Sequence, residues 1–361
     1  MITDHDKKYM TRALALAARG LYTTMPNPRV GCVLVKDGVV IGEGWHQRAG
    51  EPHAEVHALA VAGPGAEGAT AYVTLEPCSH HGRTPPCANA LVAARVRRVV
   101  CAMEDPNPLV AGRGIAALQA AGIETESGLL EDEARELNIG FVSRMTRGRP
   151  WVRMKIAASL DGRTALANGR SQWITGDAAR RDGHRWRARA CAILTGIGTV
   201  REDDPQLTVR GVRTTRQPVR IVVDGRLETP PAARVVAAGT VIVTAVDDEA
   251  RAAVLRERGA EVLPLPNAQM KVDLQALLDE LGRRAVNEVH VEAGRGLNGA
   301  MLNAGLVDEL LLYVAPMVLG DAAQGMFALP VLEELQSARR FRMHDVKRIG
   351  GDVRLIARAE V

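Results

Sequence analysis

The chain has 361 residues, of which 47% are apolar, 24% are charged and 3% are aromatic, and its formal net charge is +4. This composition is typical of an ordinary globular protein that is long enough for two domains. No stretch approaches the ~18 consecutive apolar residues of a membrane-spanning helix, so we expect no membrane segment. Nucleic-acid binding needs a concentrated basic face interleaved with aromatics, whereas arginine is spread along this chain, so we expect a small anionic ligand and no nucleic acid.

Cysteine usage and the first residues indicate a reducing compartment. The five cysteines, at positions 32, 78, 87, 101 and 191, are an odd and scattered set that does not suit a disulfide frame. The first ten residues, MITDHDKKYM, lack the apolar core of a secretion signal. We therefore expect a cytoplasmic protein.

Helices and strands are expected to alternate over about the first 140 residues. The pattern predicts a helix over Lys8–Arg19, a hairpin of Val30–Val35 and Val39–Gly42, a helix over His53–Ala62, a strand over Ala71–Leu75, a helix from Pro86, a strand over Val99–Met103, a helix after Gly114 and a strand over Ile123–Glu126. This order predicts a three-layer α/β domain with a mixed sheet.

Three residues of this region have the types expected of zinc ligands. His53, Cys78 and Cys87 offer one imidazole and two thiolates, whereas a structural zinc is held by four protein ligands. Three ligands leave one position open for a water whose pKa the metal lowers from ~15.7 toward ~7. Glu55 can then carry the proton of that water to a ring nitrogen and help the departing amine leave as ammonia. The set predicts hydrolytic deamination of a base-like amino heterocycle.

The expected local structure suits this chemistry. His53 and Glu55 fall in the first turn of a helix after Pro52, and Cys87 begins a second helix after Pro86, where partial positive charge favours thiolate over thiol. The alternatives are a structural zinc knuckle or two unrelated core cysteines. The zinc-deaminase signature has two residues between its cysteines, but residues 79–86 stand between them here, so we expect a loop beside the metal.

A polar, basic stretch over residues 143–150 interrupts the alternation, and we place the domain boundary there, between residues 146 and 147. The second half is expected to be a separate α/β domain without zinc ligands of its own. Its predicted strands are Val152–Ala157, Ala192–Thr195, Val219–Asp224, Thr240–Val246, Glu288–Glu292, Glu309–Val314, Arg342–Lys347 and Val353–Arg358. Its predicted helices begin at Asp177 and Asn298 and cover residues 248–258 and 273–284.

Two glycine-rich turns are expected after strands of the second half. Gly294–Gly299 (GRGLNG) matches the pattern GxGxxG, and Gly196–Thr199 reads GIGT. Such glycines let backbone N–H groups approach a pyrophosphate, although a glycine-rich turn without a ligand is an equally good interpretation of the first motif alone. The acidic ribose-binding residue of a standard Rossmann unit is missing, so that fold is not expected. Two such turns in one domain favour one extended nucleotide ligand.

Several longer motifs are shared with one known family over nearly the whole chain. In the first half they are Asn27–Gly31 (NPRVG), Gly44–His46 (GWH), His53–Glu55 (HAE) and Pro77–Cys87 (PCSHHGRTPPC). In the second half they are Met154–Lys155, Ala158–Arg163 (ASLDGR), Ser171–Thr175 (SQWIT), Gly198–Val200, Asp203–Pro205 and Leu207–Arg210 (LTVR). On these motifs the chain resembles the bifunctional riboflavin-biosynthesis deaminase/reductases.

The resemblance implies two consecutive reactions. A cytidine-deaminase-like domain, residues 1–146, would deaminate 2,5-diamino-6-ribosylamino-4(3H)-pyrimidinone 5′-phosphate with one zinc ion per chain. A domain similar in fold to dihydrofolate reductase, residues 147–361, would use NADPH to reduce the ribosyl chain of 5-amino-6-(5-phosphoribosylamino)uracil to ribityl. The resemblance also implies a homo-oligomer.

Residue roles follow from the same motifs. Glu55 would be the proton shuttle, and the zinc ligands would be His53, Cys78 and Cys87. The deaminase substrate would contact Asn27, His46, His80 and Arg83. In the reductase, Lys155 and Asp203 would be catalytic, and the substrate would contact Ser171, Arg187, Leu207, Arg210 and Glu292. NADPH would contact Ala157, Trp173, Thr199, Asp203, Gly294, Arg295, Gly296, Leu297, Asn298, Gly299 and Ala300.

Lys155 ranks first among the reductase residues, because an unpaired ammonium inside an apolar strand is expensive. Structural alternatives stay open elsewhere: Asp161–Gly162 as a tight turn, Trp173 as core and Asp203–Pro205 as a turn opener. Arg83 stands where relatives often have lysine. Arginine keeps the positive charge of lysine but has a different shape. Gly225 stands where a serine is common, so what binds the NADPH 2′-phosphate is left open.

Other functions also stay open at this point. A nucleic-acid base deaminase shares the zinc chemistry, but it leaves the second domain unexplained. A reductase whose zinc module serves only binding or assembly would oxidise NADPH without releasing ammonia. A zinc-stabilised binding protein would do neither.

Overall fold

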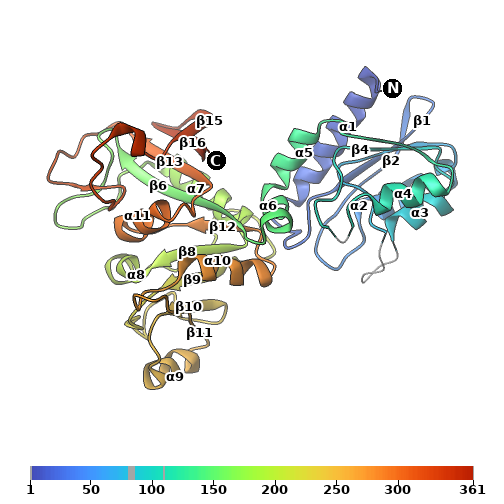
Figure 1. Ribbon diagram of the computed structural model, residues 1–361. Coiled ribbons are helices and arrows are strands. Elements are labelled where there is room, and N and C mark those ends of the chain that lie inside the picture. The colour runs from blue at the N-terminus through green and yellow to red at the C-terminus, as the bar shows by residue number, and fades with distance from the viewer. Residues whose placement is uncertain (1, 80–85, 109, 361) are drawn as a thin grey trace. The chain divides into compact units, whose positions relative to one another are not determined.

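The computed structural model describes residues 2–79, 86–108 and 110–360 (Figure 1). The chain divides into two compact units, Met1–Gly148 and Arg149–Val361. The division falls inside the polar stretch 143–150, but most of that stretch is helical, because Ser143–Arg147 complete the last helix of the first unit. Among the described residues, no helix is both long and apolar enough to cross a bilayer.

The first unit is built on a five-stranded sheet of order β2-β1-β3-β4-β5. Its strands are β1 (Gly31–Lys36), β2 (Val39–Trp45), β3 (Thr70–Val73), β4 (Arg98–Cys101) and β5 (Glu124–Ser127). β1 pairs antiparallel with β2 and β3, whereas β4 pairs parallel with β3 and β5. The predicted mixed sheet is confirmed.

Helices α1 (Asp4–Ala17) and α2 (Ala54–Ala62) pack on opposite faces of this sheet. A β-carbon on Gly31 would lie 2.0 Å from the carbonyl oxygen of Ala13, and one on Gly44 would lie 2.3 Å from that of Ala54, so both strands need glycine there. Gly44 pairs with Cys32, the neighbour of Gly31. Because successive residues of a strand point to opposite faces, the two glycines receive their helices from opposite sides. This gives the predicted three layers.

The other helices of the first unit are shorter. They are η1 (Ala18–Gly20), η2 (Gly63–Ala66), α3 (Cys87–Ala93), α4 (Arg113–Ala120), α5 (Glu131–Leu137) and α6 (Ile139–Arg147). The predicted start of the first helix at Lys8 is wrong by four residues. The cause is a capping box, in which Thr3 Oγ1 accepts from Asp6 N–H (3.2 Å) and Thr3 N–H donates to Asp6 Oδ2 (2.7 Å).

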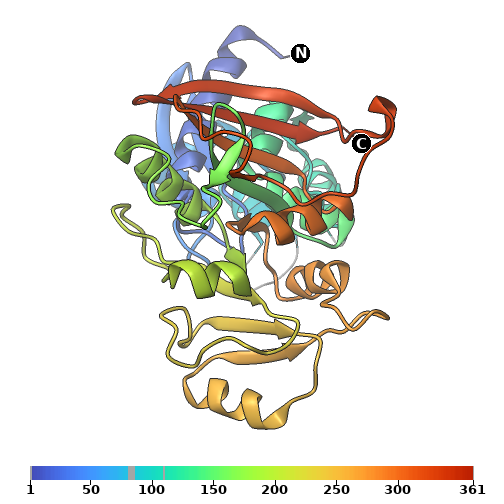
Figure 2. The same cartoon turned by 90° about the vertical axis from the view of Figure 1, so that its left-hand side faces the viewer.

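The second unit contains a nine-stranded sheet of order β11-β10-β9-β8-β12-β6-β13-β16-β15. The strands are β6 (Trp151–Ser159), β8 (Ala192–Gly196), β9 (Val219–Val223), β10 (Thr240–Thr244), β11 (Glu261–Pro264), β12 (Glu288–Val291), β13 (Glu309–Ala315), β15 (Phe341–Ile349) and β16 (Asp352–Ala359). All pairs from β11 to β13 are parallel, and the β15–β16 hairpin closes the other edge antiparallel (Figure 2). β7 (Arg163–Ala165) and β14 (Gln324–Gly325) form a small separate sheet.

The helices of the second unit correct two predictions. They are α7 (Asp177–Arg189), α8 (Ile197–Asp203), α9 (Glu249–Glu257), α10 (Leu274–Arg283), α11 (Arg295–Asn303) and the short η3 (Leu335–Ser337). The two expected glycine turns are helix starts, because Gly196 and Gly294 are the N-caps of α8 and α11. Residues 295–300 are therefore distributed around a helix and do not form a loop. The helix expected from Asn298 begins three residues earlier, at Arg295.

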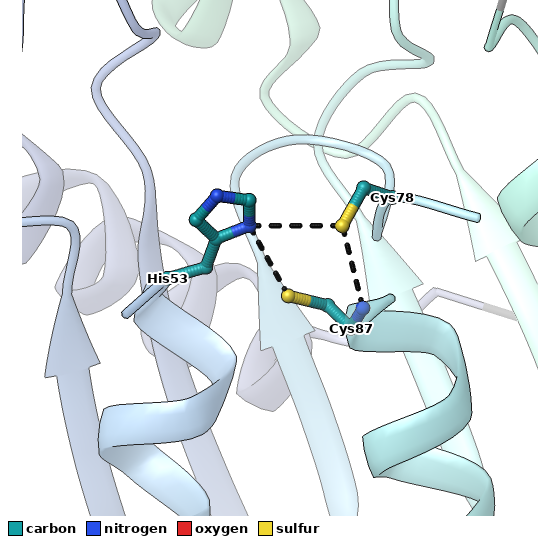
Figure 3. A group of neighbouring side chains, drawn as sticks. All are labelled: His53, Cys78 and Cys87. Atoms are coloured by element: carbon teal, nitrogen blue, oxygen red, sulfur yellow. Dashed lines mark hydrogen bonds between the residues drawn. The ribbon is translucent and has the colours of Figure 1, made fainter. Parts of the chain in front are cut away.

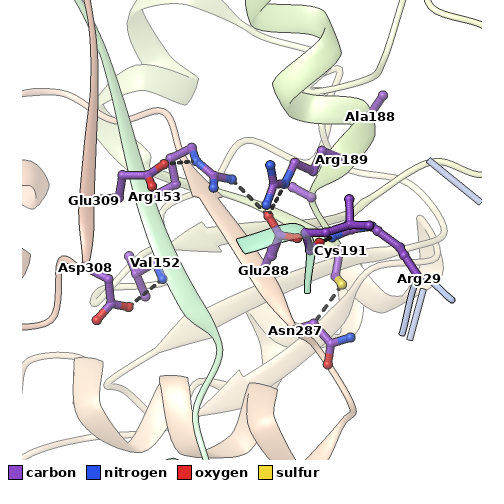
Figure 4. Close-up of polar contacts among 12 residues, drawn as sticks. Arg29, Val152, Arg153, Ala188, Arg189, Cys191, Asn287, Glu288, Asp308 and Glu309 are labelled. Carbon is purple, nitrogen blue, oxygen red and sulfur yellow. Dashed lines mark hydrogen bonds and ion pairs between the residues drawn. The ribbon is translucent and has the colours of Figure 1, made fainter. Parts of the chain in front are cut away.

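A buried ion cluster joins the central strands of this sheet (Figure 4). Arg153 on β6, whose side chain is 1% exposed, pairs with Glu288 on β12 at 3.0 Å and with Glu309 on β13. Arg189 adds a second pair to Glu288 at 2.8 Å, and Arg358 adds one to Glu309 at 3.1 Å. Because each carboxylate meets two guanidinium groups, no charge of the cluster is buried alone.

Replacing Arg153 by alanine should destabilise the second unit. The change leaves two buried carboxylates with one partner each, and we expect a loss of about 3 kcal/mol in the free energy of unfolding, the low end for a broken buried pair. Urea denaturation followed by circular dichroism measures it. The matched control is Arg256→Ala, which removes an exposed pair with Glu249 and should cost less than about 1 kcal/mol. Equal losses in the two variants would contradict the cluster's role.

Candidate active sites

Three side chains of the first unit converge at the N-termini of α2 and α3 (Figure 3). His53 is the N-cap of α2, Cys87 is the first residue of α3, and Cys78 lies in the segment after β3. His53 Nδ1 lies 3.6 Å from Cys78 Sγ and 3.3 Å from Cys87 Sγ. Ligands of one tetrahedral zinc ion are separated by about 3.5–3.8 Å. The group therefore fits a zinc ion, and it is the group of metal-ligand type found among the described residues.

The pKa values of the two thiols are shifted in opposite directions. Hydrogen bonds from Cys87 and His53 lower the pKa of Cys78 to about 4. The Cys87 thiol then donates to the Cys78 thiolate, and this contact and burial raise the pKa of Cys87 above its usual range. Two thiolates side by side are stable only beside a cation, so this donor set suits a divalent metal.

Glu55 lies beside the ligands without being one of them. It is the second residue of α2 and only 3% exposed, and it is not part of the ligand group. Burial raises its pKa to about 7. Glu55 lines the cavity, and its buried Oε2 atom has no hydrogen-bond partner in the part of the chain that the structure describes. A carboxyl group that changes protonation near neutral pH and faces a cavity is suited to general acid–base catalysis.

His53, Glu55 and Cys78 border a cavity of about 620 Å³. His46, which is 2% exposed, places Nδ1 3.2 Å from the Pro52 carbonyl and Nε2 3.1 Å from Asn27 Nδ2. Burial lowers the pKa of His46, so its imidazole is neutral. Since a carbonyl only accepts, Nδ1 carries the proton and Nε2 accepts from Asn27. The predicted residues Asn27 and His46 are thus together in the cavity wall, whereas His80 and Arg83 lie outside the described residues.

Sequence reasoning missed part of this cavity wall. Glu76, Asp105, Asn107 and Arg144 also line the cavity. A signal was present, because the Asp105–Pro108 motif (DPNP) follows the carboxyl end of the predicted strand over Val99–Met103. Polar residues in such a place are candidates for binding.

The second unit has its own cavity of about 620 Å³. It is lined by most of the predicted reductase residues, namely Lys155, Ala157, Ser171, Trp173, Arg187, Thr199, Asp203, Leu207, Arg210, Glu292, Gly294, Arg295 and Asn298. The cavity thus brings together side chains from β6, α7, α8 and α11. His184, Arg180, Gln172 and Arg234 line it as well and were not predicted.

Three charged side chains lie together in the wall of this cavity: Lys155, Arg187 and Glu292. Arg187 donates to both oxygens of Glu292, from Nε at 2.5 Å and from Nη2 at 2.7 Å. Although burial opposes it, Arg187 holds the pKa of Glu292 well below its usual range. Burial lowers the pKa of Lys155, and the nearby carboxylate of Glu292 counteracts this effect. This arrangement agrees with the expectation that the ammonium group of Lys155 needs a carboxylate near it.

The structural alternatives now have answers. Trp173 is 68% exposed and stacks with Arg180 at 4.6 Å, so its interpretation as core is wrong. Asp161–Gly162 does form a tight turn, with Gly162 at φ 72°. Asp203 is the last residue of α8, and its Oδ1 accepts a hydrogen bond from Gln172 Nε2 at 3.1 Å.

Only part of the predicted glycine motif borders the cavity. The lining includes Gly294, Arg295 and Asn298 but not Gly296, Leu297, Gly299 and Ala300. The physical reason is the helix: Leu297 packs on Gly196, and Gly299 is pressed against the backbone of Ala328, where a β-carbon would lie 2.1 Å from its carbonyl oxygen.

The same end of α11 fits a phosphate-bearing cofactor. The N-cap of α11 is Gly294, which has no side chain to accept hydrogen bonds from the free N–H groups of the first helical turn. Asn298 lines the cavity, and its buried Oδ1 atom has no partner among the described residues. The free N–H groups would donate hydrogen bonds to a phosphate of a dinucleotide, and Asn298 Oδ1 would accept one from a polar group of the same ligand.

Comparisons with known proteins define the class of each half. Residues 3–103 match the family model of the cytidine and deoxycytidylate deaminase zinc-binding region, and residues 150–355 match that of the RibD C-terminal domain. The chain is 52% identical to riboflavin biosynthesis protein RibD of Escherichia coli (strain K12), over 96% of this chain and 98% of that protein.

Solved structures agree with these matches. The Acinetobacter baumannii RibD structure (form 1) superposes with a TM-score of 0.92 at 46% identity, over 99% of both chains. A diaminohydroxyphosphoribosylaminopyrimidine deaminase/5-amino-6-(5-phosphoribosylamino)uracil reductase from Thermotoga maritima superposes with a TM-score of 0.87 at 32% identity, over 98% of this chain and 99% of that one. The chain therefore belongs to the RibD family of bifunctional riboflavin-biosynthesis enzymes. It is a zinc-dependent deaminase and an NADPH-dependent reductase.

Removing one proposed ligand should remove the metal. We expect Cys87→Ala to lower bound zinc well below one ion per chain and to abolish ammonia release, because two ligands remain. Metal analysis of the purified protein measures the first effect and an ammonia assay the second. Cys191→Ser, in the second unit, is the control and should retain both. Full zinc and full activity in Cys87→Ala would show that the ligand set is different.

Proposed function

We propose that the chain deaminates 2,5-diamino-6-ribosylamino-4(3H)-pyrimidinone 5′-phosphate in residues 1–146 and reduces the resulting 5-amino-6-(5-phosphoribosylamino)uracil in residues 147–361. The observation that carries the proposal is the His53–Cys78–Cys87 group, with Glu55 beside it in the cavity that His53 and Cys78 also line. The Oε2 atom of Glu55 has no hydrogen-bond partner among the described residues. The names of the Thermotoga maritima protein's two activities support the substrates. The test is to measure ammonia release and NADPH consumption on the same pyrimidine phosphate.

In the deaminase, His53, Cys78 and Cys87 would hold the metal. Zinc, when bound, supplies a Lewis acid that makes water a nucleophile near neutral pH. Glu55 would take one proton from that water as its oxygen bonds to C2 of the pyrimidine, and deliver it to a ring nitrogen. It would then carry the remaining proton of that oxygen to the 2-amino group, whose C–N bond breaks to release ammonia. Asn27 and His46 would hold the pyrimidine and ribose phosphate, together with His80 and Arg83.

In the reductase, Lys155 would orient and polarise the opened sugar end of the substrate, with Asp203 beside it. NADPH, when bound, supplies the hydride to C1′. Arg187 and Glu292 would hold each other in place against the substrate, with Ser171, Leu207 and Arg210 completing its wall. The cofactor would lie along Ala157, Trp173, Thr199, Gly294, Arg295 and Asn298.

We also propose a cytoplasmic homo-oligomer that binds no nucleic acid. The five cysteines are free among the described residues, which suits a reducing compartment. The charged groups that line the two cavities are suited to a small phosphorylated substrate, and aromatic residues for base stacking are scarce.

Glu55→Gln should separate metal binding from proton transfer. Glutamine has nearly the same shape but cannot carry the proton, so we expect zinc to stay and the deamination rate to fall about 100-fold or more. Steady-state ammonia release and zinc analysis on the same sample give the answer. NADPH oxidation with the deaminated substrate should be unchanged and is the internal control. Zinc lost together with activity would make Glu55 a ligand or a structural partner instead.

Lys155→Ala should separate the two half-reactions in the opposite way. Loss of the ammonium removes the group that polarises the sugar, so we expect NADPH oxidation to fall about 100-fold or more, while ammonia release is retained. Lys271→Ala, which removes an exposed lysine of the same unit, is the matched control and should leave both rates unchanged. Equal loss of both activities in Lys155→Ala would mean that Lys155 serves folding.

A further inference from the structure

Glu76 holds a segment of the deaminase cavity wall through four backbone hydrogen bonds. Its Oε2 accepts from the N–H groups of Asp105 and Gly112, both at 3.0 Å, and its Oε1 accepts from those of Gly114 at 2.7 Å and Ile115 at 3.2 Å. The side chain is buried, with 3% of the residue exposed. A carboxylate can accept four hydrogen bonds and offers no donor of its own, so it suits a site surrounded only by donors.

A close backbone contact joins the same two segments. A β-carbon on Gly114 would lie 1.9 Å from the carbonyl oxygen of Pro77 and 3.0 Å from Glu76 Oε1. Any side chain at position 114 would therefore push its segment away from Glu76–Pro77. Glycine and carboxylate act together to bring the two chains into contact.

The segment that Glu76 holds is itself ordered. Asn107 N–H donates to Asp105 Oδ1 at 2.9 Å, and the Asn107 carbonyl accepts from Val110 and Ala111 at 2.8 and 2.9 Å. Asp105, Asn107 and Val110 line the cavity that also contains His53 and Glu55. The cavity wall thus depends on a turn whose attachment point is Glu76.

We propose that Glu76 is a positioning residue of the deaminase, which acts by presenting Asp105 and Asn107 to the substrate. This proposal rests on the proposed deaminase function. A carboxylate and an amide are the groups that recognise the amino and carbonyl edges of a diaminopyrimidinone. Glu76 touches neither the substrate nor the reacting atoms in this role, and its effect is on where the turn lies.

The first test is Glu76→Gln. Glutamine has one oxygen, so its amide NH₂ must face two of the four N–H donors and release either the Asp105 or the Gly114 side of the segment. We expect KM for the diaminopyrimidine phosphate to rise about tenfold or more, with kcat changed less than about threefold. Zinc content should stay at one ion per chain. Glu104→Gln removes an exposed carboxylate of the same segment and should leave KM unchanged.

A double-mutant cycle then asks whether Glu76 acts through the turn. If it does, Glu76→Gln adds little to the KM of Asn107→Ala, because the presented group is already gone. Independent, multiplicative effects would overturn the proposal. So would loss of zinc and of kcat in Glu76→Gln with KM unchanged, since Glu76 would then belong to the scaffold of the metal ligands.

Gly114→Ala keeps the carboxylate but displaces the segment, so it decides the matter if Glu76→Gln does not fold. The proposal expects a similar rise in KM, and an unchanged KM overturns it. NADPH oxidation in each variant reports whether the second unit is intact. Failure of the wild-type protein to release ammonia would instead count against the proposed deaminase itself.

Discussion

The first unit depends on two helices that begin at the same place. His53 precedes α2 and Cys87 opens α3, while the strand β3 leads the chain to Cys78. The imidazole and both sulfur atoms therefore arrive at the positive ends of two helices, where thiolates and a metal-bound anion are stabilised. Glycines at the β1–β2 pairs allow α1 and α2 to lie directly on the sheet, and this packing keeps the helix starts in place. The chemistry is thus a consequence of where the layers touch.

Much of this was predictable, because the relevant signals are local. Residue types and spacing predicted that His53, Cys78 and Cys87 come together with Glu55 beside them, and the alternation of apolar runs predicted the mixed sheet. The longer motifs identified the family and most of the reductase cavity wall. What these signals share is that each depends on a few neighbouring residues.

The misses have physical causes that lie outside a local window. Gly294 was read as part of a phosphate loop, but a glycine can equally be an N-cap, and only tertiary packing decides. Once α11 starts at Arg295, helical geometry turns Leu297 and Gly299 toward the core. No role was predicted for Glu76, because its partners, from Asp105 to Ile115, lie 29 to 39 residues away in the sequence. Long-range hydrogen bonds leave no periodic trace in a sequence.

The neutral imidazole of His46 has a consequence for what the deaminase cavity selects. With its proton committed to the Pro52 carbonyl, His46 accepts from the Asn27 amide nitrogen and so determines which way that amide faces. The carbonyl oxygen of Asn27, which can only accept, is then left for other partners. A ligand hydroxyl or amino group is matched at this point, whereas a bare carbonyl or an ether oxygen meets another acceptor. A cavity lined in this way would discriminate between ligands by hydrogen-bond polarity, through a residue that does not need to change its charge.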